Sequence, residues 1–391
     1  MMTGLPARLS CGDALFIDGL FGIGLSRPID GLARDWILQL NAAQARVVAA
    51  DVPSGIDSDT GGVVGGLTGV ALRARSTVSF LADKPGLHTG AGLEHAGEVR
   101  VSDLGCTATL GDATLIDRDE LTPIAARLRR KPDSHKGSFG QVCVIGGGRG
   151  MEGAALLAAL GAQRAGAGKV IVHSRRGEAV VLPSAPQLMT SSTLDLHRSP
   201  VVAIGCGLGT DTHAMSLLRQ CLNAVDCPLV IDADALNLIA RHAPLRRLLA
   251  TRTQFAVATP HPLEAARMLG TDARSVQADR VDAARRLAKN YSVVVVLKGA
   301  GSVIASPCGN WGIIDSGDPS LATAGSGDVL AGVIAALLAQ GLSGVEAASL
   351  GAWLHGRAGE LWAGEHSGSA GLSAAEIPDR VRLALNQIVA A

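Results

Sequence analysis

A segment near the C-terminus combines residues that can hold an anion with one that can move a proton. Gly325, Ser326 and Gly327 are followed by Asp328 and then by the apolar run 329–338. Glycine lets consecutive backbone N–H groups turn toward one point, and the helix expected to follow adds about half a positive charge at its N-terminus, so the turn is predicted to be an anion hole for phosphate. Asp328 would repel that phosphate, so it either caps the helix or performs proton chemistry. The segment alone leaves both interpretations open.

A histidine and a lysine each follow an apolar run. His261 lies between Pro260 and Pro262, which favour an extended backbone before a helix that starts at Pro262, so we expect its ring to contact a ligand rather than only to cap the helix. Lys298 follows the run Val293–Leu297 and precedes a glycine; it would either neutralise a nucleotide phosphate or lie solvated at the surface. Ligands bind at the carboxyl ends of strands in open parallel sheets, where both residues are expected.

Two more predicted strands end in polar or flexible residues. The cluster at 205–209, Gly-Cys-Gly-Leu-Gly, would let the backbone approach a diphosphate closely, although ordinary tight turns have a similar composition. Asp232 and Asp234 follow the apolar run 229–231. We expect Asp234 to cap the next helix, whereas Asp232 could orient a metal-bound water.

A third glycine cluster suggests a different class of enzyme. Gly148, Gly150 and Gly153 form a G-x-G-x-x-G pattern between a predicted strand and a predicted helix, as in dinucleotide-dependent oxidoreductases. The acidic residue that would bind the ribose is missing, because the next strand ends in Arg175 and Arg176. These arginines could serve an NADP enzyme or belong to a tight loop, so hydride transfer is the less favoured interpretation.

The elements that must position these residues alternate along the chain. Short β-branched runs bounded by Gly, Pro or Asp are followed by Ala- and Leu-rich segments, which predicts an α/β fold with mostly parallel strands. The polar stretch Arg127–Gly137 contains a helix-stopping proline and indicates a domain junction. We therefore expect a short first domain at 1–110, a linker at 111–136 and a full-sized second domain at 137–391.

Composition excludes several classes of protein. Thirty-five basic residues balance thirty-five acidic ones, without a dense basic run, which argues against nucleic acid as a partner. The sequence has neither a span of about 18 uninterrupted apolar residues nor a basic start before an apolar core, so we expect no membrane partner and a cytoplasmic location. The seven cysteines include no C-x-x-C pair, which argues against disulfides and structural zinc, and we expect them to be buried thiols.

The order of these motifs, preceded by His135-Lys136-Gly137, closely resembles that of the NAD(P)H-hydrate dehydratases of the ribokinase-like superfamily. The resemblance covers nearly all of the second domain and implies a ribokinase-like α/β domain with a central, mostly parallel sheet. It also implies which residues bind the two ligands. Those expected to contact the hydrated nicotinamide are Ala154, Gly209, His261 and Asp328. Those expected to contact the nucleotide are Lys298, Gly299, Ala300, Gly301, Ser302 and Gly327.

Members of this family restore NADH or NADPH from hydrated forms, with ADP in bacteria and ATP in eukaryotes, and with magnesium. The resemblance therefore implies NAD(P)H hydrate as substrate, ADP or ATP as co-substrate, Mg²⁺, and a homotetramer. Asp328 would remove the proton of the substrate hydroxyl while the backbone of Gly325, Ser326 and Gly327 stabilises charge on the transferred phosphoryl group. The alternatives are a ribokinase-like kinase of a vitamin precursor and a non-catalytic nucleotide-binding protein.

The first domain has a resemblance of its own. The segments Asp18–Leu25, Ala50–Asp57 and Lys84–Leu87 read either as ordinary βα turns and a loop or as the C-terminal half of the NAD(P)H-hydrate epimerase domain, a partial Rossmann-like α/β domain. By that likeness Asp18 and Ser54 would bind potassium. The residues that would face the hydrated nucleotide are Gly22, Ile23, Gly24, Leu25, Ser26, Arg27, Pro28 and Asp51.

The first domain also departs from that family. Epimerases of this type use an Asn-x-Gly-Gly-Asp segment for the same ion and substrate, and no asparagine of this chain is followed by such glycines. We therefore expect a truncated epimerase domain that has lost its isomerase activity or whose start lies upstream. Missing strands would leave sheet edges exposed, so we also expect this domain to be unstable unless another subunit covers it.

Overall fold

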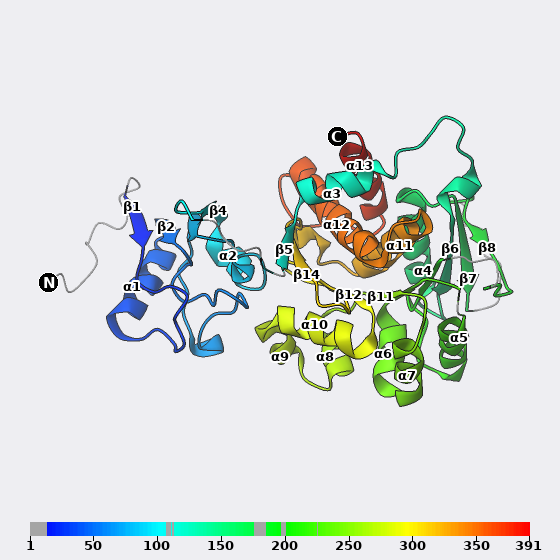
Figure 1. Cartoon of the computed structure of the whole chain (residues 1–391), viewed down its shortest axis with the longest axis horizontal. Helices are drawn as coiled ribbons and strands as arrows, with labels where there is room; N and C mark the ends of the chain where they lie inside the picture. Colours follow the sequence, from blue (N-terminus) through cyan, green and yellow to red (C-terminus); the bar gives the residue numbers. More distant parts are fainter. Residues whose placement is uncertain (1–13, 107–110, 112, 176–184, 197–200, 225) are drawn as a thin grey trace. The chain divides into compact units, whose positions relative to one another are not determined.

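The computed structural model describes residues 14–106, 111, 113–175, 185–196, 201–224 and 226–391 (Figure 1). They form two compact units. Unit 1 comprises Met1–Ala113, Arg274–Val281 and Gly299–Gly301, and unit 2 comprises Thr114–Ala273, Asp282–Lys298 and Ser302–Ala391. The membrane test gives a negative result here: no helix among the described residues combines the length and the apolar character needed to cross a bilayer.

Unit 1 contains a small parallel sheet. Its described strands lie in the order β1 (Leu15–Asp18), β2 (Arg46–Ala50), β3 (Ser76–Phe80) and β4 (Glu98–Ser102). The helices α1 (Gly31–Ala42) and α2 (Gly92–Ala96) belong to the same unit, as does most of α9 (Ala273–Ala278). The edge strand β1 leaves Leu15 and Ile17 exposed, with 59% and 77% of their surface accessible.

Unit 2 is built on a long sheet that is mostly parallel. Its described strands lie in the order β5 (Ala113–Ile116), β14 (Trp311–Ile314), β13 (Val303–Ala305), β12 (Val294–Leu297), β11 (Ala256–Ala258), β10 (Leu229–Ile231), β9 (Val201–Ile204), β6 (Gln141–Gly146), β7 (Lys169–Ser174) and β8 (Met189–Thr190). The pairs from β12 through β8 are parallel, whereas β12–β13 and β13–β14 are antiparallel. The predicted α/β fold with mostly parallel strands is confirmed.

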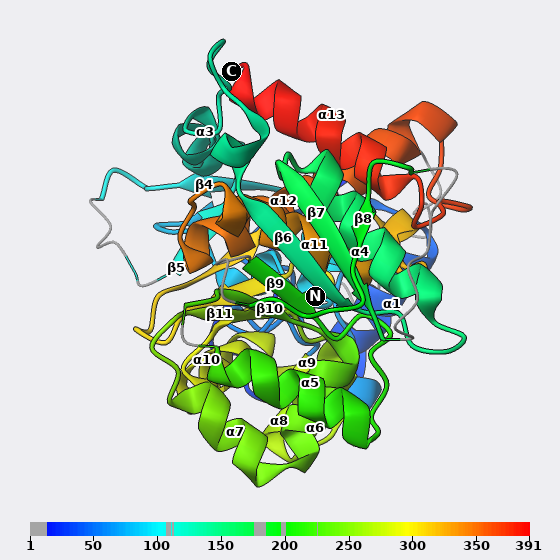
Figure 2. The ribbon, with the colours of Figure 1, turned by 90° about the vertical axis from the view of Figure 1, so that its right-hand side faces the viewer.

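Helices cover both faces of this sheet (Figures 1 and 2). One side carries α3 (Arg118–Ala126), α4 (Glu152–Arg164), α11 (Ser326–Ala339), α12 (Gly344–His366) and α13 (Ile377–Val389). The other side carries α5 (Thr212–Asn223), α6 (Ala233–Arg241), α7 (Ala243–Ala250), α8 (Pro262–Leu269) and α10 (Arg280–Tyr291). Parallel strands buried on both faces explain why β9 to β12 consist almost wholly of apolar residues.

Residues 111–136, expected to be a linker, include regular structure. They contain β5 and α3, and Leu121 and Ala125 of α3 are buried in the core of unit 2. The segment joins the fold because α3 packs against α12 and α13 with its apolar side. The polar stretch that suggested a junction begins only after α3 ends at Ala126.

The core of unit 2 centres on the contact between α4 and α11. Helix α11 is apolar on all sides and is buried from Val329 to Leu338, as expected of a helix that lies between a sheet and other helices. The two helices approach closely because glycine stands at the contact. A Cβ atom on Gly332 would lie 1.8 Å from the backbone oxygen of Ala158, and one on Gly161 would lie 2.5 Å from the oxygen of Val329. This packing sets the distance between the first turn of α11 and the sheet.

Gly332→Ala should therefore destabilise the protein although alanine favours helices. We expect a loss of about 1–3 kcal/mol, since the new methyl group meets backbone rather than a flexible side chain. Gly364→Ala in α12 is the matched control, because no atom lies within 4 Å of a Cβ there. This variant should raise the free energy of unfolding by about 0.5–1 kcal/mol, the difference in helix propensity between alanine and glycine. Chemical denaturation measures the free energy of unfolding of both variants. Equal changes in the two would contradict the close packing of α4 against α11.

Candidate active site

The predicted anion hole is formed at the start of α11. Gly325 occupies the N-cap position with φ +90°, a conformation that favours glycine, and no side chain caps the helix there. Asp328 lies in the first turn, two residues after the first helical residue, and so is not the N-cap. The interpretation of Asp328 as the capping residue is therefore wrong, and its carboxylate is available for another task.

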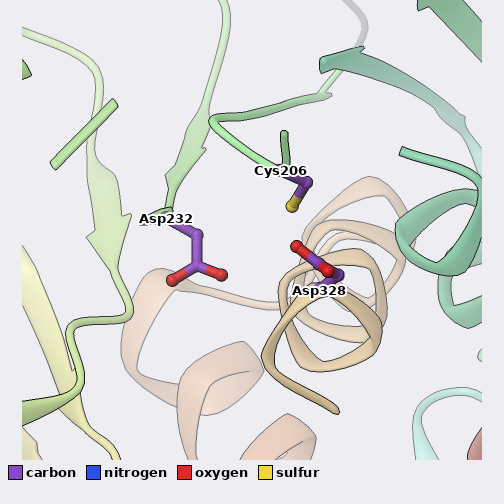
Figure 3. A group of neighbouring side chains, drawn as sticks. All are labelled: Cys206, Asp232 and Asp328. Atoms are coloured by element: carbon purple, nitrogen blue, oxygen red, sulfur yellow. The ribbon is translucent and has the colours of Figure 1, made fainter. Parts of the chain in front are cut away.

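Three side chains from different elements meet beside this turn (Figure 3). Cys206 follows β9, Asp232 follows β10, and Asp328 belongs to α11; the Cys206 sulfur and one carboxylate oxygen of each aspartate all lie within 4.8 Å of one another. Burial, then the charge of Asp232, raise the pKa of Asp328 to about 6, against the opposing effects of the Cys206 thiol and of Lys298. Asp328 is thus able to accept a proton near neutral pH.

Asp232 is compensated by an ion pair. The Lys298 ammonium lies 2.7 Å from a carboxylate oxygen of Asp232, whose side chain is 3% exposed. Burial acts to lower the pKa of Lys298, but the facing carboxylates of Asp232 and Glu264 outweigh it and raise the pKa. A Cβ atom on Gly327 would lie only 3.1 Å from the ammonium nitrogen, so the glycine leaves Lys298 room beside the anion hole. Lys298 is therefore not the solvated surface lysine of the alternative interpretation.

His261 caps α8 through one ring nitrogen, and its other ring nitrogen faces Glu264. Its Nδ1 accepts hydrogen bonds from the backbone N–H of Leu263 and Glu264 at 3.1 and 3.4 Å. Burial and the charge of Lys298 lower the pKa of His261, so the ring is neutral at neutral pH and carries its hydrogen on Nε2. Nε2 lies 3.3 Å from the Glu264 carboxylate. The capping role of His261, which the sequence suggested as the lesser one, is therefore present. A contact between its Nε2–H group and a ligand stays a prediction.

The glycine turn after β9 is held by two charged side chains. The carboxylate of Asp234 accepts a hydrogen bond of 2.7 Å from the N–H of Gly209, which has φ +77°. The expectation that Asp234 caps α6 is therefore wrong, because Asp232 takes the N-cap position and Asp234 is already the second residue of the helix, with its carboxylate bound to the turn after β9. Arg175 donates to the oxygen of Leu208 at 2.9 Å and pairs with Asp211. An arginine held in this way is not free for a 2′-phosphate, which disfavours the oxidoreductase interpretation; Arg176 lies outside the described residues.

His355 contacts the predicted anion hole through Ser326. Its Nε2 lies 3.0 Å from both the hydroxyl and the backbone oxygen of Ser326, and burial lowers its pKa to about 4. The ring is therefore a neutral hydrogen-bonding partner of the turn. Nothing in the sequence pointed to it, because His355 stands alone in the middle of α12.

The remaining predicted contacts occupy two places. Ala154 lies near the start of α4, with its Cβ 3.2 Å from where a Cβ on Gly207 would stand. Within unit 1, the loop Gly299–Gly301 is bound by the Thr89 hydroxyl, which donates to the oxygens of Ala300 and Gly301 at 3.1 Å each. The nucleotide contacts assigned to Lys298, Gly299, Ala300, Gly301, Ser302 and Gly327 stay predictions.

The predicted ion-binding residues of unit 1 contact each other. Ser54 donates to Asp18 through its N–H at 2.7 Å and its hydroxyl at 2.6 Å, and both side chains are buried. Asp51 has φ +72° and pairs with Lys84 at 2.6 Å. Oxygen atoms of this kind suit a hard cation by type, but potassium binding stays a prediction, as does the role of Gly22–Pro28.

The donor set in unit 2 does not fit magnesium. In the part of the chain that the structure describes, Cys206, Asp232 and Asp328 are the one group of three side chains close enough to share an ion. Magnesium requires oxygen ligands, whereas burial and both carboxylates raise the pKa of the Cys206 thiol well above its ordinary value, and the Lys298 ammonium already lies against Asp232. A magnesium ion at this site would therefore take its ligands mainly from nucleotide phosphates and water.

The cysteines divide into two groups. Cys143, Cys206, Cys221 and Cys227 are buried as expected, whereas Cys106 and Cys308 are exposed. The expectation of buried thiols is thus wrong for these two, which lie in surface turns; Cys11 lies outside the described residues.

Comparison with families of known proteins identifies both parts of the chain. Residues 142–381 match the family model described as NAD(P)H-hydrate dehydratase, and residues 4–86 match that of the YjeF-related protein N-terminus. The bifunctional NAD(P)H-hydrate repair enzyme Nnr of Moorella thermoacetica is 39% identical over 88% of this chain and 68% of its own length. The ADP-dependent (S)-NAD(P)H-hydrate dehydratase of Neisseria meningitidis is 43% identical over 66% of this chain and 89% of its own length.

Solved structures give the same answer for unit 2. The ADP/ATP-dependent NAD(P)H-hydrate dehydratase of Bacillus subtilis, co-crystallised with ATP and Mg²⁺, is similar with a TM-score of 0.62 and 30% identity, covering 70% of this chain and 98% of that one. A second structure from Bacillus subtilis, YxkO, has a TM-score of 0.61 and 29% identity over the same shares of both chains.

The raised pKa of Asp328 predicts a cost to folding. Because the folded pKa of about 6 exceeds the ordinary 3.8, the stability associated with this group is fully present below about pH 4 and is lost as the pH rises through about 6. Asp328→Asn should therefore stabilise the protein by about 1–2 kcal/mol at about pH 8 and by nothing at about pH 4. Denaturant titration at the two pH values measures this.

Asp232→Asn is the matched control for that measurement. It removes the partner of Lys298 instead of an uncompensated charge, so it should destabilise the protein where Asp328→Asn stabilises it. Two variants that shift stability in the same direction would show that the two carboxylates are not in the different electrostatic states described here.

Proposed function

The chain belongs to the NAD(P)H-hydrate dehydratase family, and from that premise we propose that it dehydrates (S)-NAD(P)H hydrate to NAD(P)H at the expense of a nucleotide, ADP by preference. The protein is thus a lyase that repairs a damaged cofactor. One observation supports this above the others: a carboxylate with a pKa near neutrality, Asp328, lies in the first turn of the helix whose N-terminus forms an anion hole.

The reaction that fits this arrangement is phosphoryl transfer followed by elimination. Asp328 accepts the proton of the substrate hydroxyl, whose oxygen bonds to the terminal phosphorus of the nucleotide while the bond from that phosphorus to the bridging oxygen breaks. The backbone N–H groups of Gly325, Ser326 and Gly327 stabilise the charge on the phosphoryl group. Phosphate then leaves with the C–O electron pair while the lone pair of the ring nitrogen forms a double bond to that carbon, and transfer of a proton from the adjacent ring carbon to the released phosphate restores the dihydronicotinamide.

The neighbouring side chains have electrostatic and orienting roles. Lys298 places a positive charge beside the anion hole, where it would attract nucleotide phosphates while Asp232 holds it in place. The Nε2–H of His261 is a neutral donor suited to an uncharged acceptor such as the nicotinamide carbonyl. Gly209 and Ala154 are the other proposed contacts of the hydrated nicotinamide. Magnesium would be held by the nucleotide phosphates, so no step is assigned to the protein side chains through it.

An epimerase-like domain occupies the N-terminal part of the chain, where residues 4–86 match the YjeF-related family. We propose that this domain does not epimerise hydrated NAD(P)H by itself. The support is the sequence itself, which lacks an Asn-x-Gly-Gly-Asp segment. Asp18 and Ser54 are the proposed potassium ligands, and Asp51 with Gly22–Pro28 the proposed substrate contacts.

A small-molecule kinase of the ribokinase-like class is the second candidate, since the same anion hole and carboxylate would serve it. The products separate the two. A kinase leaves a stable phosphorylated product, whereas the dehydratase releases phosphate and regenerates dihydronicotinamide absorbance.

Assembly as a homotetramer, implied by the family resemblance, is to be tested by light scattering.

The first test of the proposed function supplies (S)-NADH hydrate with ADP or ATP to the purified protein. We expect NADH absorbance to return with release of phosphate in equal amount. Asp328→Asn should lower the rate about 100-fold or more, since a general base contributes about 10²- to 10⁴-fold, while nucleotide affinity measured by calorimetry stays within about threefold. Asp318→Asn, at the start of a separate turn, is the control and should keep full activity.

The second test uses the other epimer. Given (R)-NADH hydrate and ADP, the protein should regenerate NADH no faster than the epimers interconvert without enzyme. Adding a separate, active epimerase should restore the rate seen with the S form. Fast turnover of the R form by this chain alone would show that unit 1 is a working epimerase, contrary to the proposal.

A further inference from the structure

Cys206 is a buried side chain to which the mechanism has so far given no role. It follows β9 in the turn 205–209, is 1% exposed, and points toward Asp328 and Asp232 (Figure 3). The remaining described cysteines either lie in the core or are exposed, away from this cluster. The thiol thus lies beside two carboxylates at the carboxyl ends of β9 and β10, and the proposed mechanism does not explain why it is there.

The backbone around Cys206 is tightly constrained. Gly205 has φ +127°, and a Cβ atom there would lie 1.8 Å from the backbone oxygen of Asp232; one on Gly207 would lie 2.6 Å from that of Met151. The backbone oxygen of Cys206 accepts a hydrogen bond from Gly147 at 3.1 Å. Because the turn is packed against two other segments, the end of β10 and the loop 147–151, the direction of the Cys206 side chain is set by the fold and not by the thiol's own contacts.

The surroundings decide which chemistry this thiol can perform. Burial, followed by the charges of Asp328 and Asp232, raises the pKa of Cys206 well above its ordinary value. A neutral thiol is neither a nucleophile nor a metal ligand, because both tasks need the thiolate. What remains is the S–H group as a hydrogen-bond donor.

Of the two carboxylates, Asp328 is the one that needs a donor. Asp232 already holds the Lys298 ammonium at 2.7 Å. Asp328 has no ammonium of its own, but the Cys206 sulfur lies within 4.8 Å of one of its carboxylate oxygens and points toward it (Figure 3), where an S–H group favours the ionised carboxylate and acts to lower its pKa. The groups that face Asp328 are thus Asp232 and Asp234, which raise its pKa, and Cys206 and Lys298, which lower it.

We propose that Cys206 is a positioning residue for Asp328: its S–H donates to one carboxylate oxygen and fixes the plane of the carboxylate, so that the other oxygen is presented to the substrate hydroxyl. The proposal rests on the proposed function for its kinetic consequence, but the hydrogen bond itself exists or not whatever the substrate is. It assigns a role that is specific to this turn and that a structural thiol in the core would not have.

The kinetic test compares Cys206→Ala, Cys206→Ser and Cys221→Ala. Loss of the donor in Cys206→Ala should move the acidic limb of the kcat/KM profile upward by about half a pH unit and lower kcat about threefold to tenfold, with the KM for nucleotide unchanged. Cys206→Ser keeps a donor and should return the limb to its original position. Cys221, fully buried in α5, is the control: its loss costs stability but should leave the limb where it is. If the acidic limb of the kcat/KM profile lies at the same pH in Cys206→Ala and Cys221→Ala, the proposal is overturned.

A second measurement separates this proposal from the proposed function. Infrared difference spectra of the whole protein and of Cys206→Ala isolate the S–H stretching band of Cys206. We expect this band to lie at lower frequency than that of a free thiol, to shift when Asp328 is titrated, and to lose that pH dependence in Asp328→Asn. A band that ignores both the pH and the Asp328→Asn change overturns the proposal even if the dehydratase activity is found. The expected band without activity on hydrated cofactor would leave Cys206 as the donor and refute the dehydratase instead.

Discussion

The site is organised by an imbalance of charge: two carboxylates, Asp232 and Asp328, share the neighbourhood of one ammonium, Lys298. The ammonium lies against Asp232 at 2.7 Å, so Asp328 is left with burial and a nearby negative charge, and its pKa rises to about 6. Had the pairing been reversed, Asp328 would hold its charge tightly and would be a weak base near neutral pH. The pairing of Lys298 with Asp232 therefore leaves Asp328 as the carboxylate with the raised pKa, and it follows from the sheet, in which Lys298 comes directly after β12 and Asp232 directly after β10, two strands away.

This arrangement depends on how closely α11 approaches the sheet. Gly332 and Gly161 let α11 and α4 pack with their backbones nearly in contact, and Gly327 leaves room for Lys298. Side chains at these positions would push the helix away from β9 and β10, and the distance between Asp328 and Asp232 would grow with it. The glycines of unit 2 thus serve two different purposes. Those inside helices set distances between elements, whereas Gly325 supplies a backbone conformation that favours glycine.

Features that depend on a few neighbouring residues could be predicted from the sequence. The turn before α11, the start of α8 at Pro262 and the parallel sheet all follow from local composition, because proline and glycine restrict the backbone directly. Features that depend on partners far along the chain could not. Asp234 bonds Gly209, twenty-five residues away, and His355 supports Ser326 from the next helix. Cys206 was visible in the sequence only as a member of a glycine cluster, since its role arises when β9 and α11 meet. The segment 111–136 looked like a linker because its polar end is more conspicuous than the few apolar residues by which α3 packs.

His261 shows why capping and ligand binding need not be competing interpretations. A helix N-terminus that takes up Nδ1 through two backbone N–H groups fixes the tautomer, so the only ring hydrogen is on Nε2. Burial, followed by the nearby Lys298 charge, lowers the pKa of the ring and so disfavours a second proton. The same two contacts that make His261 a cap therefore make it a neutral donor of constant direction, which is what a carbonyl group of a bound nicotinamide requires. Removing the cap would free the tautomer as well as the helix end, and a ligand-binding histidine with two tautomers would spend part of its time presenting a lone pair where a hydrogen is needed.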